Sequence, residues 1–465
     1  MVIRRSPRAK QEIRRMGVTI SRGKTCKSCC FRKRGPSWCV SKRIMSGEPP
    51  QAPAFCEALR FWTKLGWISF GGPAGQIAIM HRELVEVRRW VSESSFLHAL
   101  QFCMLLPGPE AQQLATYLGW RMHGLRGGIV AGLLFILPSA FLLFGLSWLY
   151  VVHGQTRWLD GVFNGFMAAV IVLIVSALIR MARKSLGGWP QRLMAVCAFG
   201  LMWWGGVSFV WIILIAAVCG VFLTKHQPVA GTEHTEEHSA PRPHGLRRSI
   251  AIMAACLALW AAPLLAVFVL LGKSSTLFQL GVFFSKAALV TFGGAYAVLP
   301  YVSQMAVHHY GWIGPDQMMA GLALAETTPG PLIMVLQFVG FLAAWHQPGT
   351  LSPLMAALYG SAITTWVTFV PSFLFILVGA PTIETLRDFP RWKRAMNGIT
   401  AAVIGLIAHL AFSVTHHTLS PPADGFQPIA AVLVVVAWFV MRFRGGSVVS
   451  MLVACGGLGA AFALW

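Results

Sequence analysis

Apolar segments of about 20 residues recur along almost the whole of this 465-residue chain, and short polar connections separate them. About 20 helical residues cross the hydrocarbon core of a bilayer. The pattern therefore predicts an all-α, polytopic integral membrane protein with about 10–13 transmembrane helices. Segments broken by Gly or Pro can also enter the membrane and return. The candidate spans are residues 55–80, 95–118, 127–152, 161–179, 193–206, 207–223, 249–271, 277–300, 317–345, 353–380, 396–416, 427–441 and 447–465.

Two parts of the chain resemble each other, which predicts an internal duplication. FWTKLGWISFGG at 61–72 matches FFSKAALVTFGG at 283–294, 222 residues later. NGFMAAVI at 164–171 matches NGITAAVI at 397–404, 233 residues later, in the same order along the chain. The other matched pairs are Trp90 with Trp312, Pro107-Gly108-Pro109 with Pro329-Gly330-Pro331, and Pro138-Ser139 with Pro371-Ser372.

Basic residues predict that the two repeats have opposite orientations. The first NG helix is followed by a basic cluster that includes Arg180 and Lys184, so we expect it to end in the cytoplasm. The second is instead preceded by a cluster that includes Arg391, so we expect it to begin there. Matching segments of opposite orientation are typical of transporters with inverted repeats.

The expected organisation has five parts. Residues 1–54 form a basic N-terminal tail, residues 55–192 the first repeat, residues 193–276 connecting helices with a polar linker at 224–248, residues 277–416 the second repeat, and residues 417–465 C-terminal helices. The tail has no apolar stretch, and we interpret residues 1–44 as a mis-assigned start, with Met45 as the alternative, or as a disordered basic arm.

Composition agrees with a bilayer environment, since 56% of the residues are hydrophobic, 12% are charged and the mean hydropathy is +0.63. The net charge of +22 raises the question of nucleic-acid binding. Residues 1–50, however, hold fourteen Lys and Arg against two acids, and most other basic residues lie in short loops beside apolar segments. We therefore expect the lipid bilayer as a partner and no nucleic acid. The tail cysteines and linker histidines lack the spacing of a defined zinc site, and no nucleotide motif occurs, so we expect neither metal nor cofactor.

Each repeat has two breaks that could expose backbone groups to an anion. Paired glycines remove side-chain cover, and two prolines in three residues prevent continuous helical hydrogen bonding. A helix that begins after such a break carries partial positive charge at its N-terminus. Close packing of helices and a simple kink are the structural alternatives. The residues concerned are Ser69, Phe70, Gly71 and Gly72, Pro107, Gly108 and Pro109, Thr291, Phe292, Gly293 and Gly294, and Pro329, Gly330 and Pro331.

Four ionisable residues lie near these breaks. Lys64 and Lys286 occupy equivalent positions in apolar runs, where each could bind an anion or extend to the membrane surface. Glu326 precedes the second Pro-Gly-Pro and Glu110 follows the first. Both are candidates for proton coupling, with a static ion pair as the alternative that we favour for Glu110.

Taken together, Phe70-Gly71-Gly72-Pro73, LLPGPEAQQLATYLGW at 105–120, TFGG at 291–294, ETTPGP at 326–331 and the paired NG helices resemble the long-chain, two-domain chromate ion transporter family from about residue 55 to the end. The resemblance implies a multi-pass protein of the bacterial inner membrane with a cytoplasmic N-terminus. It also implies export of chromate, and hence chromate resistance, driven by the membrane potential or by a proton gradient in the manner of an antiporter.

Several alternatives stay open at this stage. Sulfate is a tetrahedral dianion like chromate, so a transporter of sulfate or another oxyanion is the nearest alternative, and a passive anion channel is a second. An enzyme is disfavoured because no catalytic cluster appears. A homodimer is also an open arrangement.

Overall fold

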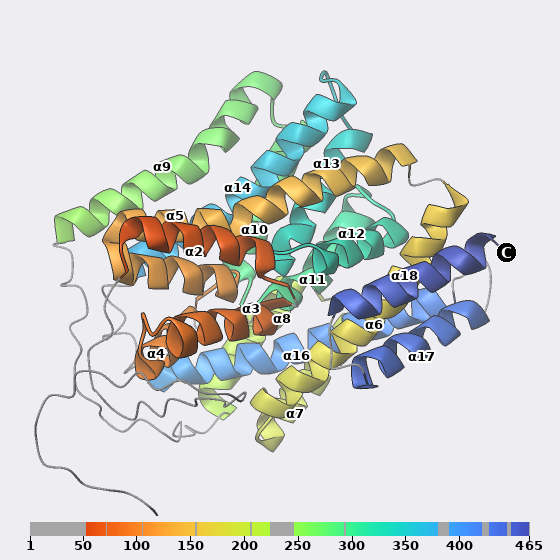
Figure 1. Ribbon diagram of the computed structural model, residues 1–465, viewed down its shortest axis with the longest axis horizontal. Helices are drawn as coiled ribbons and strands as arrows, with labels where there is room; N and C mark the ends of the chain where they lie inside the picture. Colours follow the sequence, from red (N-terminus) through yellow and green to blue (C-terminus); the bar gives the residue numbers. More distant parts are fainter. Residues whose placement is uncertain are drawn as a thin grey trace, which may run out of the picture. The chain divides into compact units, whose positions relative to one another are not determined.

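The computed structural model describes residues 53–70, 72–104, 106–153, 156–204, 207–223, 246–292, 294–379, 390–420, 427–443 and 448–464. The regular structure of these residues is helical throughout (Figure 1). Most of the basic tail and most of the polar linker, with their cysteines and histidines, lie outside the described residues, as do Gly71 and Gly293.

The elements before the linker are α2 (Phe55–Ile68), α3 (Gly72–His81), the π-helical turn η1 (Arg82–Val87), α4 (Glu93–Cys103), α5 (Glu110–His153), α6 (Arg157–Ser185), α7 (Trp189–Trp203) and α8 (Phe209–Leu223). The helix that follows the linker is α9 (Leu246–Leu271). The remaining elements are α10 (Thr276–Val290), α11 (Ala295–Ser303), the π-helical turn η2 (Gln304–His309), α12 (Pro315–Thr327), the 3₁₀ turn η3 (Leu332–Met334), α13 (Val335–His346), α14 (Pro353–Gly379), α16 (Pro390–Leu419), α17 (Pro428–Phe443) and α18 (Val448–Leu464).

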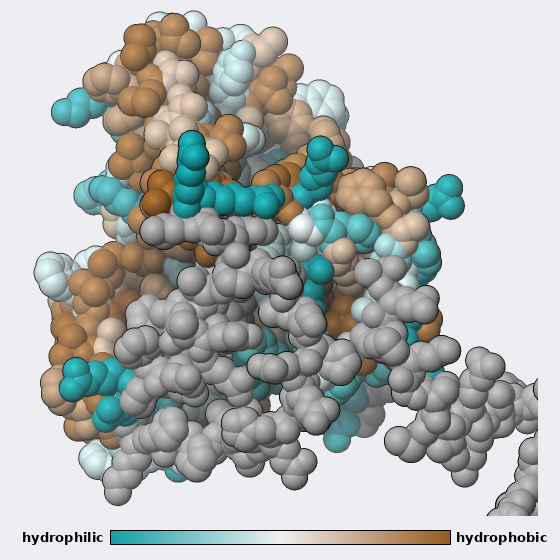
Figure 2. Space-filling model, turned by 90° about the vertical axis from the view of Figure 1, so that its left-hand side faces the viewer, coloured by the Kyte–Doolittle hydropathy of each residue, from teal (hydrophilic) through white to brown (hydrophobic). Residues whose placement is uncertain are grey.

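The helices have the lengths and surfaces of a membrane protein. Within the described residues, five helical segments are long and apolar enough to cross a bilayer, and five shorter apolar helices accompany them. Large apolar side chains such as Trp204, Phe222 and Leu270 are strongly exposed, as expected of surface in contact with lipid. Figure 2 shows apolar side chains over much of one face, with hydrophilic ones gathered across its middle. These features confirm the all-α, polytopic membrane fold.

Four predicted spans are not continuous helices, and each is interrupted at a motif. The spans predicted at 55–80 and 277–300 divide at the paired glycines into α2 and α3, and into α10 and α11. The spans at 95–118 and 317–345 divide at Pro-Gly-Pro, where the chain cannot continue its helical hydrogen bonds. A new helix begins after the first of these breaks at Glu110, as predicted, and after the second with η3 and α13.

Helix α5 contains the end of the span predicted at 95–118 and the whole span predicted at 127–152, and its kink falls between the two, as their separation predicted. Its 44 residues contain non-helical backbone at His123 and Gly124, where φ is −135° and 62°. The helix is therefore two helical pieces joined at a kink rather than one straight rod.

The two halves repeat the same local hydrogen bonds. Ser69 Oγ donates to the carbonyl oxygen of Leu65, and Thr291 Oγ1 donates to that of Ala287, both at 2.6 Å. The two donors are 222 positions apart in the sequence, and so are the two acceptors. The π-helical turns η1 and η2 have the same separation. The matched sequences thus form matched local structures.

Helices from one half pack against the long helix of the other. α7 and α8 pack on α16, whereas α17 and α18 pack on α6 (Figure 1). The backbones approach closely at equivalent places, because a Cβ on Gly165 of α6 would clash with the carbonyl oxygen of Cys455. A Cβ on Gly398 of α16 would likewise clash with that of Ala216. Small residues at membrane helix crossings permit such contact.

Candidate functional site

The breaks of the two halves meet each other through reciprocal backbone hydrogen bonds. The N–H of Gly108, in the first Pro-Gly-Pro, donates to the carbonyl oxygen of Thr291 at 2.7 Å. The N–H of Gly330, in the second, donates to the carbonyl oxygen of Ser69 at 2.8 Å. The central N–H group of each Pro-Gly-Pro is therefore satisfied by the opposite half, since the membrane interior requires such groups to be paired.

Only glycine fits at the centre of each Pro-Gly-Pro. Gly108 and Gly330 have φ values of +129° and +115°, which residues with a side chain rarely adopt. Space is also lacking, because a Cβ on Gly108 would lie 2.6 Å from Ser372 Oγ, and one on Gly330 would lie 2.5 Å from Ser139 Cβ. These two serines belong to the Pro-Ser pairs that match between the halves.

Glutamine side chains from the first half stabilise both breaks. Gln76 Nε2 donates to the carbonyl oxygen of Gly330 at 2.5 Å, and Gln113 Nε2 donates to that of Pro107 at 2.7 Å. The equivalent positions in the second half are Val298 and Val335, so this support comes from one half only.

Glu110 lies beside a glycine of the opposite half, and Glu326 is connected to one through the hydroxyl of Tyr296. A Cβ on Gly294 would lie 3.5 Å from Glu110 Oε1. Glu326 is only 4% exposed, and its Oε1 accepts a 2.5 Å hydrogen bond from the hydroxyl of Tyr296. A Cβ on Gly72 would lie 3.5 Å from that same hydroxyl oxygen. Both acids, predicted from sequence as separate features, are thus brought to the meeting point of the breaks.

The cations that act on these acids come from α6. The charge of Arg180 acts on Glu326 and Tyr296, and the charge of Lys184, one turn later, acts on Glu110. Lys64 and Lys286, predicted as anion ligands, have exposed side chains on α2 and α10. An exposed lysine on a membrane helix fits the alternative of extension to the membrane surface.

The other predicted residues gather around the same point. Those that are buried are Ser69, Gly72, Gly108, Pro109, Thr291, Gly294, Pro329, Gly330 and Pro331, whereas Phe70, Pro107 and Phe292 are partly buried. Gly71 and Gly293 lie outside the described residues.

Sequence reasoning missed several polar groups at this point. Tyr296 and Gln76 stand in apolar surroundings with no counterpart in the other half, so the repeat gave no signal for either. Ser139 was identified only as a marker of the repeat. Its hydroxyl is buried beside Gly330 and has no hydrogen-bond partner among the described residues. An oxyanion could accept a hydrogen bond from such a hydroxyl.

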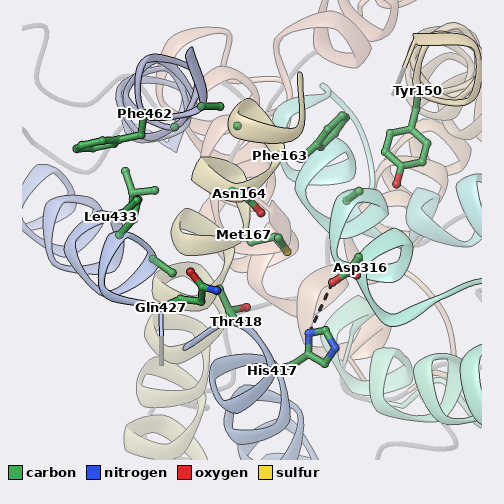
Figure 3. A pocket seen from close by; sticks show the side chains of 16 residues that line it. Tyr150, Phe163, Asn164, Met167, Asp316, His417, Thr418, Gln427, Leu433 and Phe462 are labelled. Atoms are coloured by element: carbon green, nitrogen blue, oxygen red, sulfur yellow. Dashed lines mark ion pairs between the residues drawn. The ribbon is translucent and has the colours of Figure 1, made fainter. Parts of the chain in front are cut away.

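A separate cavity of about 670 Å³ is lined by the start of α6, the start of α12, the end of α16 and residues of α17 and α18, and by none of the break residues. Figure 3 shows Asn164, Asp316 and His417 around it, with His417 Nδ1 3.6 Å from Asp316 Oδ1. Asn164 belongs to the first NG motif. The start of one NG helix, α6, and the end of the other, α16, line the same cavity, so opposite ends of these two helices lie near each other.

Comparison with known proteins decides the family. The chromate transporter family matches this chain over two separate stretches, residues 56–221 and 278–460. This chain belongs to the chromate transporter family. The matched stretches end close to the ends of α8 and α18, so they include most of the helices that pack across the halves.

Curated members of the chromate transporter family cover most of the chain. A chromate transport protein of Pseudomonas aeruginosa is 35% identical over 380 residues, which are 80% of this chain and 83% of the relative. One of Cupriavidus metallidurans is 30% identical over 415 residues, 86% of this chain and 91% of the relative. The names of these relatives indicate a transporter rather than an enzyme. No solved structure matches the chain.

Proposed function

We propose that this protein is a secondary active transporter that exports chromate across the bacterial inner membrane and so confers chromate resistance. The observation that carries the proposal is the reciprocal contact of the breaks, Gly108 with Thr291 and Gly330 with Ser69. Helices α3, α5 and α11 begin at these breaks, and η3 followed by α13 begins after the second Pro-Gly-Pro. Helix N-termini attract anions, and broken helices that meet within a membrane are typical of substrate sites in secondary transporters.

Two inverted repeats related through this contact would allow the site to face either side of the membrane. In Figure 1, α6 and α16 run in opposite directions, which supports the inversion expected from the basic residues. The start of α9 and the start of α16, both rich in Arg, lie toward the same side of the figure. We assign that side to the cytoplasm, together with the N-terminus.

The positive charge for a dianion would come from α6 and from backbone N–H groups. Arg180 and Lys184 act on the acids at the breaks, and at the inner ends of the spans they would attract chromate from the cytoplasm. All four of these basic side chains are exposed, and Lys64 and Lys286 are the weaker candidates because, of the four, only the charges of Arg180 and Lys184 act on the acids at the breaks.

Energy would come from the membrane potential, which drives an anion out of a negatively charged cell, or from protons. Glu326 is the first candidate for proton coupling because it is almost fully buried and lies at the breaks. Glu110 is the second, and its position next to Gly294 also suits a static role.

Everted membrane vesicles test this function, because their interior corresponds to the outside of the cell. We expect chromate uptake into vesicles that contain the protein and none above background in vesicles that lack it. The uptake should respond to an imposed membrane potential or pH difference. Absence of chromate uptake under all of these conditions would overturn the proposal.

Sulfate measured in the same vesicles separates the nearest alternative, since backbone N–H groups and basic side chains would fit either tetrahedral dianion. Uptake of sulfate in preference to chromate would make the protein a sulfate transporter. Flux that follows the anion gradient alone, with no accumulation against it, would identify a passive channel.

A further inference from the structure

Tyr296 is placed to connect the two halves at the candidate site. It lies in the first turn of α11, directly after the second pair of glycines, and its side chain is 8% exposed. Its hydroxyl is 2.5 Å from Glu326 Oε1 of α12 and faces the first pair of glycines at Gly72. A single phenol therefore contacts the buried acid and lies where an anion would meet the opposite half.

We propose that Tyr296 couples the protonation of Glu326 to oxyanion binding at Gly72. This inference rests on the proposed transport function and deepens it by naming the residue that connects proton and substrate. The position 222 residues earlier is Ala74, so only one half carries such a hydroxyl.

The coupling follows from the single hydrogen atom of the phenol, which can be donated to one acceptor at a time. When Glu326 is ionised, its carboxylate accepts that hydrogen across the 2.5 Å contact with the Tyr296 hydroxyl. When Glu326 takes a proton from water, its own O–H can donate to the phenol oxygen. The phenol hydrogen is then free for an oxyanion at Gly72.

Charge acts in the same direction. A carboxylate close to a bound dianion repels it, whereas a protonated carboxyl does not. Proton and anion binding therefore favour each other, with one proton taken up by Glu326 for each anion bound. Chromate would move together with a proton as a complex of net charge −1, which an inside-negative potential still drives outward. The coupling would be cotransport rather than the antiport that the resemblance implies.

The ionisable groups around Glu326 are consistent with this exchange. Tyr296 of α11 forms a hydrogen bond with Glu326, and the charge of Arg180 of α6 acts on Glu326. Glu110 of α5 lies beside Gly294. His346 of α13 lies away from the site, with its Nδ1 3.3 Å from the carbonyl oxygen of Trp312, which precedes α12. Arg180 would stabilise both the ionised acid and an incoming anion.

The test measures chromate binding and proton uptake together on the purified full-length protein. The protein is titrated with chromate in weakly buffered detergent solution at mildly alkaline pH, where dissolved chromate is the dianion. The variants are Tyr296→Phe, Glu326→Gln and the double variant. Tyr301→Phe is the matched control, since it removes another buried hydroxyl from α11 within an aromatic cluster away from the breaks.

We expect the parent and Tyr301→Phe to take up about one proton for each chromate bound. Tyr296→Phe should bind chromate roughly 10- to 100-fold more weakly, the effect of losing a hydrogen bond to a charged group. Glu326→Gln should bind chromate without proton uptake, and the double variant should bind as weakly as Tyr296→Phe alone. Thermal unfolding of each variant checks that it is folded.

Other results would overturn the inference. Tyr296→Phe with the affinity and proton uptake of the parent would show that the phenol only packs beside Glu326. Proton release on chromate binding would show antiport instead. If Tyr296→Phe does not fold, Glu326→Gln still decides, because proton uptake retained by that variant would contradict the scheme. A parent protein that binds no chromate would instead refute the transport function itself.

Discussion

Gly108 and Thr291 are joined by a 2.7 Å hydrogen bond from the backbone of one half of the chain to the backbone of the other. Its counterpart joins Gly330 to Ser69. The central N–H of each Pro-Gly-Pro is therefore satisfied by the opposite half, and the two halves must fold against each other. A relative movement of the halves would have to exchange these bonds for others, to substrate or water, because unpaired backbone groups are costly inside a membrane.

The first prediction concerns the glycines of this contact. Gly108→Ala and Gly330→Ala should each destabilise the protein by about 1–3 kcal/mol or more, because they combine an unfavourable φ with a steric clash. Gly145→Ala in α5 is the control, since a Cβ there has nothing within 4 Å. Thermal unfolding in detergent measures the effect. Equal stability of Gly108→Ala, Gly330→Ala and Gly145→Ala would contradict the described geometry of the breaks.

The second prediction concerns topology. In a background without the ten native cysteines, single cysteines near Lys184 and Arg391 should be labelled from the cytoplasm. Cysteines near Gly154, which lies outside the described residues, and near His417 should be labelled from outside the cell. Labelling of the Lys184 and Gly154 sites from the same side would exclude the proposed inversion.

Much of this arrangement follows from the sequence because periodic and repeated features are local. The breaks at Pro107-Gly108-Pro109 and Pro329-Gly330-Pro331 were predictable, since proline cannot donate a helical hydrogen bond. Their reciprocal contact was not, because a sequence offset shows which segments are alike and not which ones meet. The packing of α18 on α6 was missed for the same reason.

Charged residues were harder to place than breaks. Lys64 and Lys286 drew attention because they interrupt apolar runs, yet a helix can present such a side chain outward. Arg180 and Lys184 were interpreted only as topology signals, although the fold brings their charge to Glu326 and Glu110. The sequence alone does not show that α6 carries the charges that act on the two acids.

The third prediction separates these two sets of cations. Arg180→Gln should weaken chromate affinity by up to about 10-fold at low salt, because it removes a charge that attracts the dianion, and less at high salt because ions screen that charge. Lys64→Met and Lys286→Met should leave affinity unchanged. Chromate uptake into everted vesicles at two ionic strengths measures this. A loss confined to the Lys64 and Lys286 variants would return the anion site to those lysines.

The fourth prediction assigns the cavity to the outer side of the membrane. Asn164 is exposed and lies around this cavity, which is also lined by Asp316 and the end of α16 (Figure 3). In the cysteine-free background, Asn164→Cys should react with a membrane-impermeant thiol reagent added to intact cells, and the reaction should slow chromate export. Thr156→Cys, at an exposed position directly before α6 that does not line the cavity, is the control for reaction without an effect on export. Reaction of the Asn164 site only in everted vesicles would place the cavity on the inner side.

The last prediction assigns different roles to the two acids at the breaks. Glu326 is almost fully buried and bonded to Tyr296, whereas Glu110 is partly buried beside Gly294 under the charge of Lys184. Substitution by Gln keeps the shape of each side chain but fixes it in a neutral state. Glu326→Gln should therefore leave chromate exchange measurable in vesicles and abolish its response to an imposed pH difference. Glu110→Gln should keep that response, since we assign it a static role, and lose exchange only as far as the site itself is disturbed.

If Glu326→Gln still follows imposed pH differences like the parent while Glu110→Gln does not, the coupling acid is Glu110. If both variants follow them, neither acid carries the coupling, and it lies at another group of the protein.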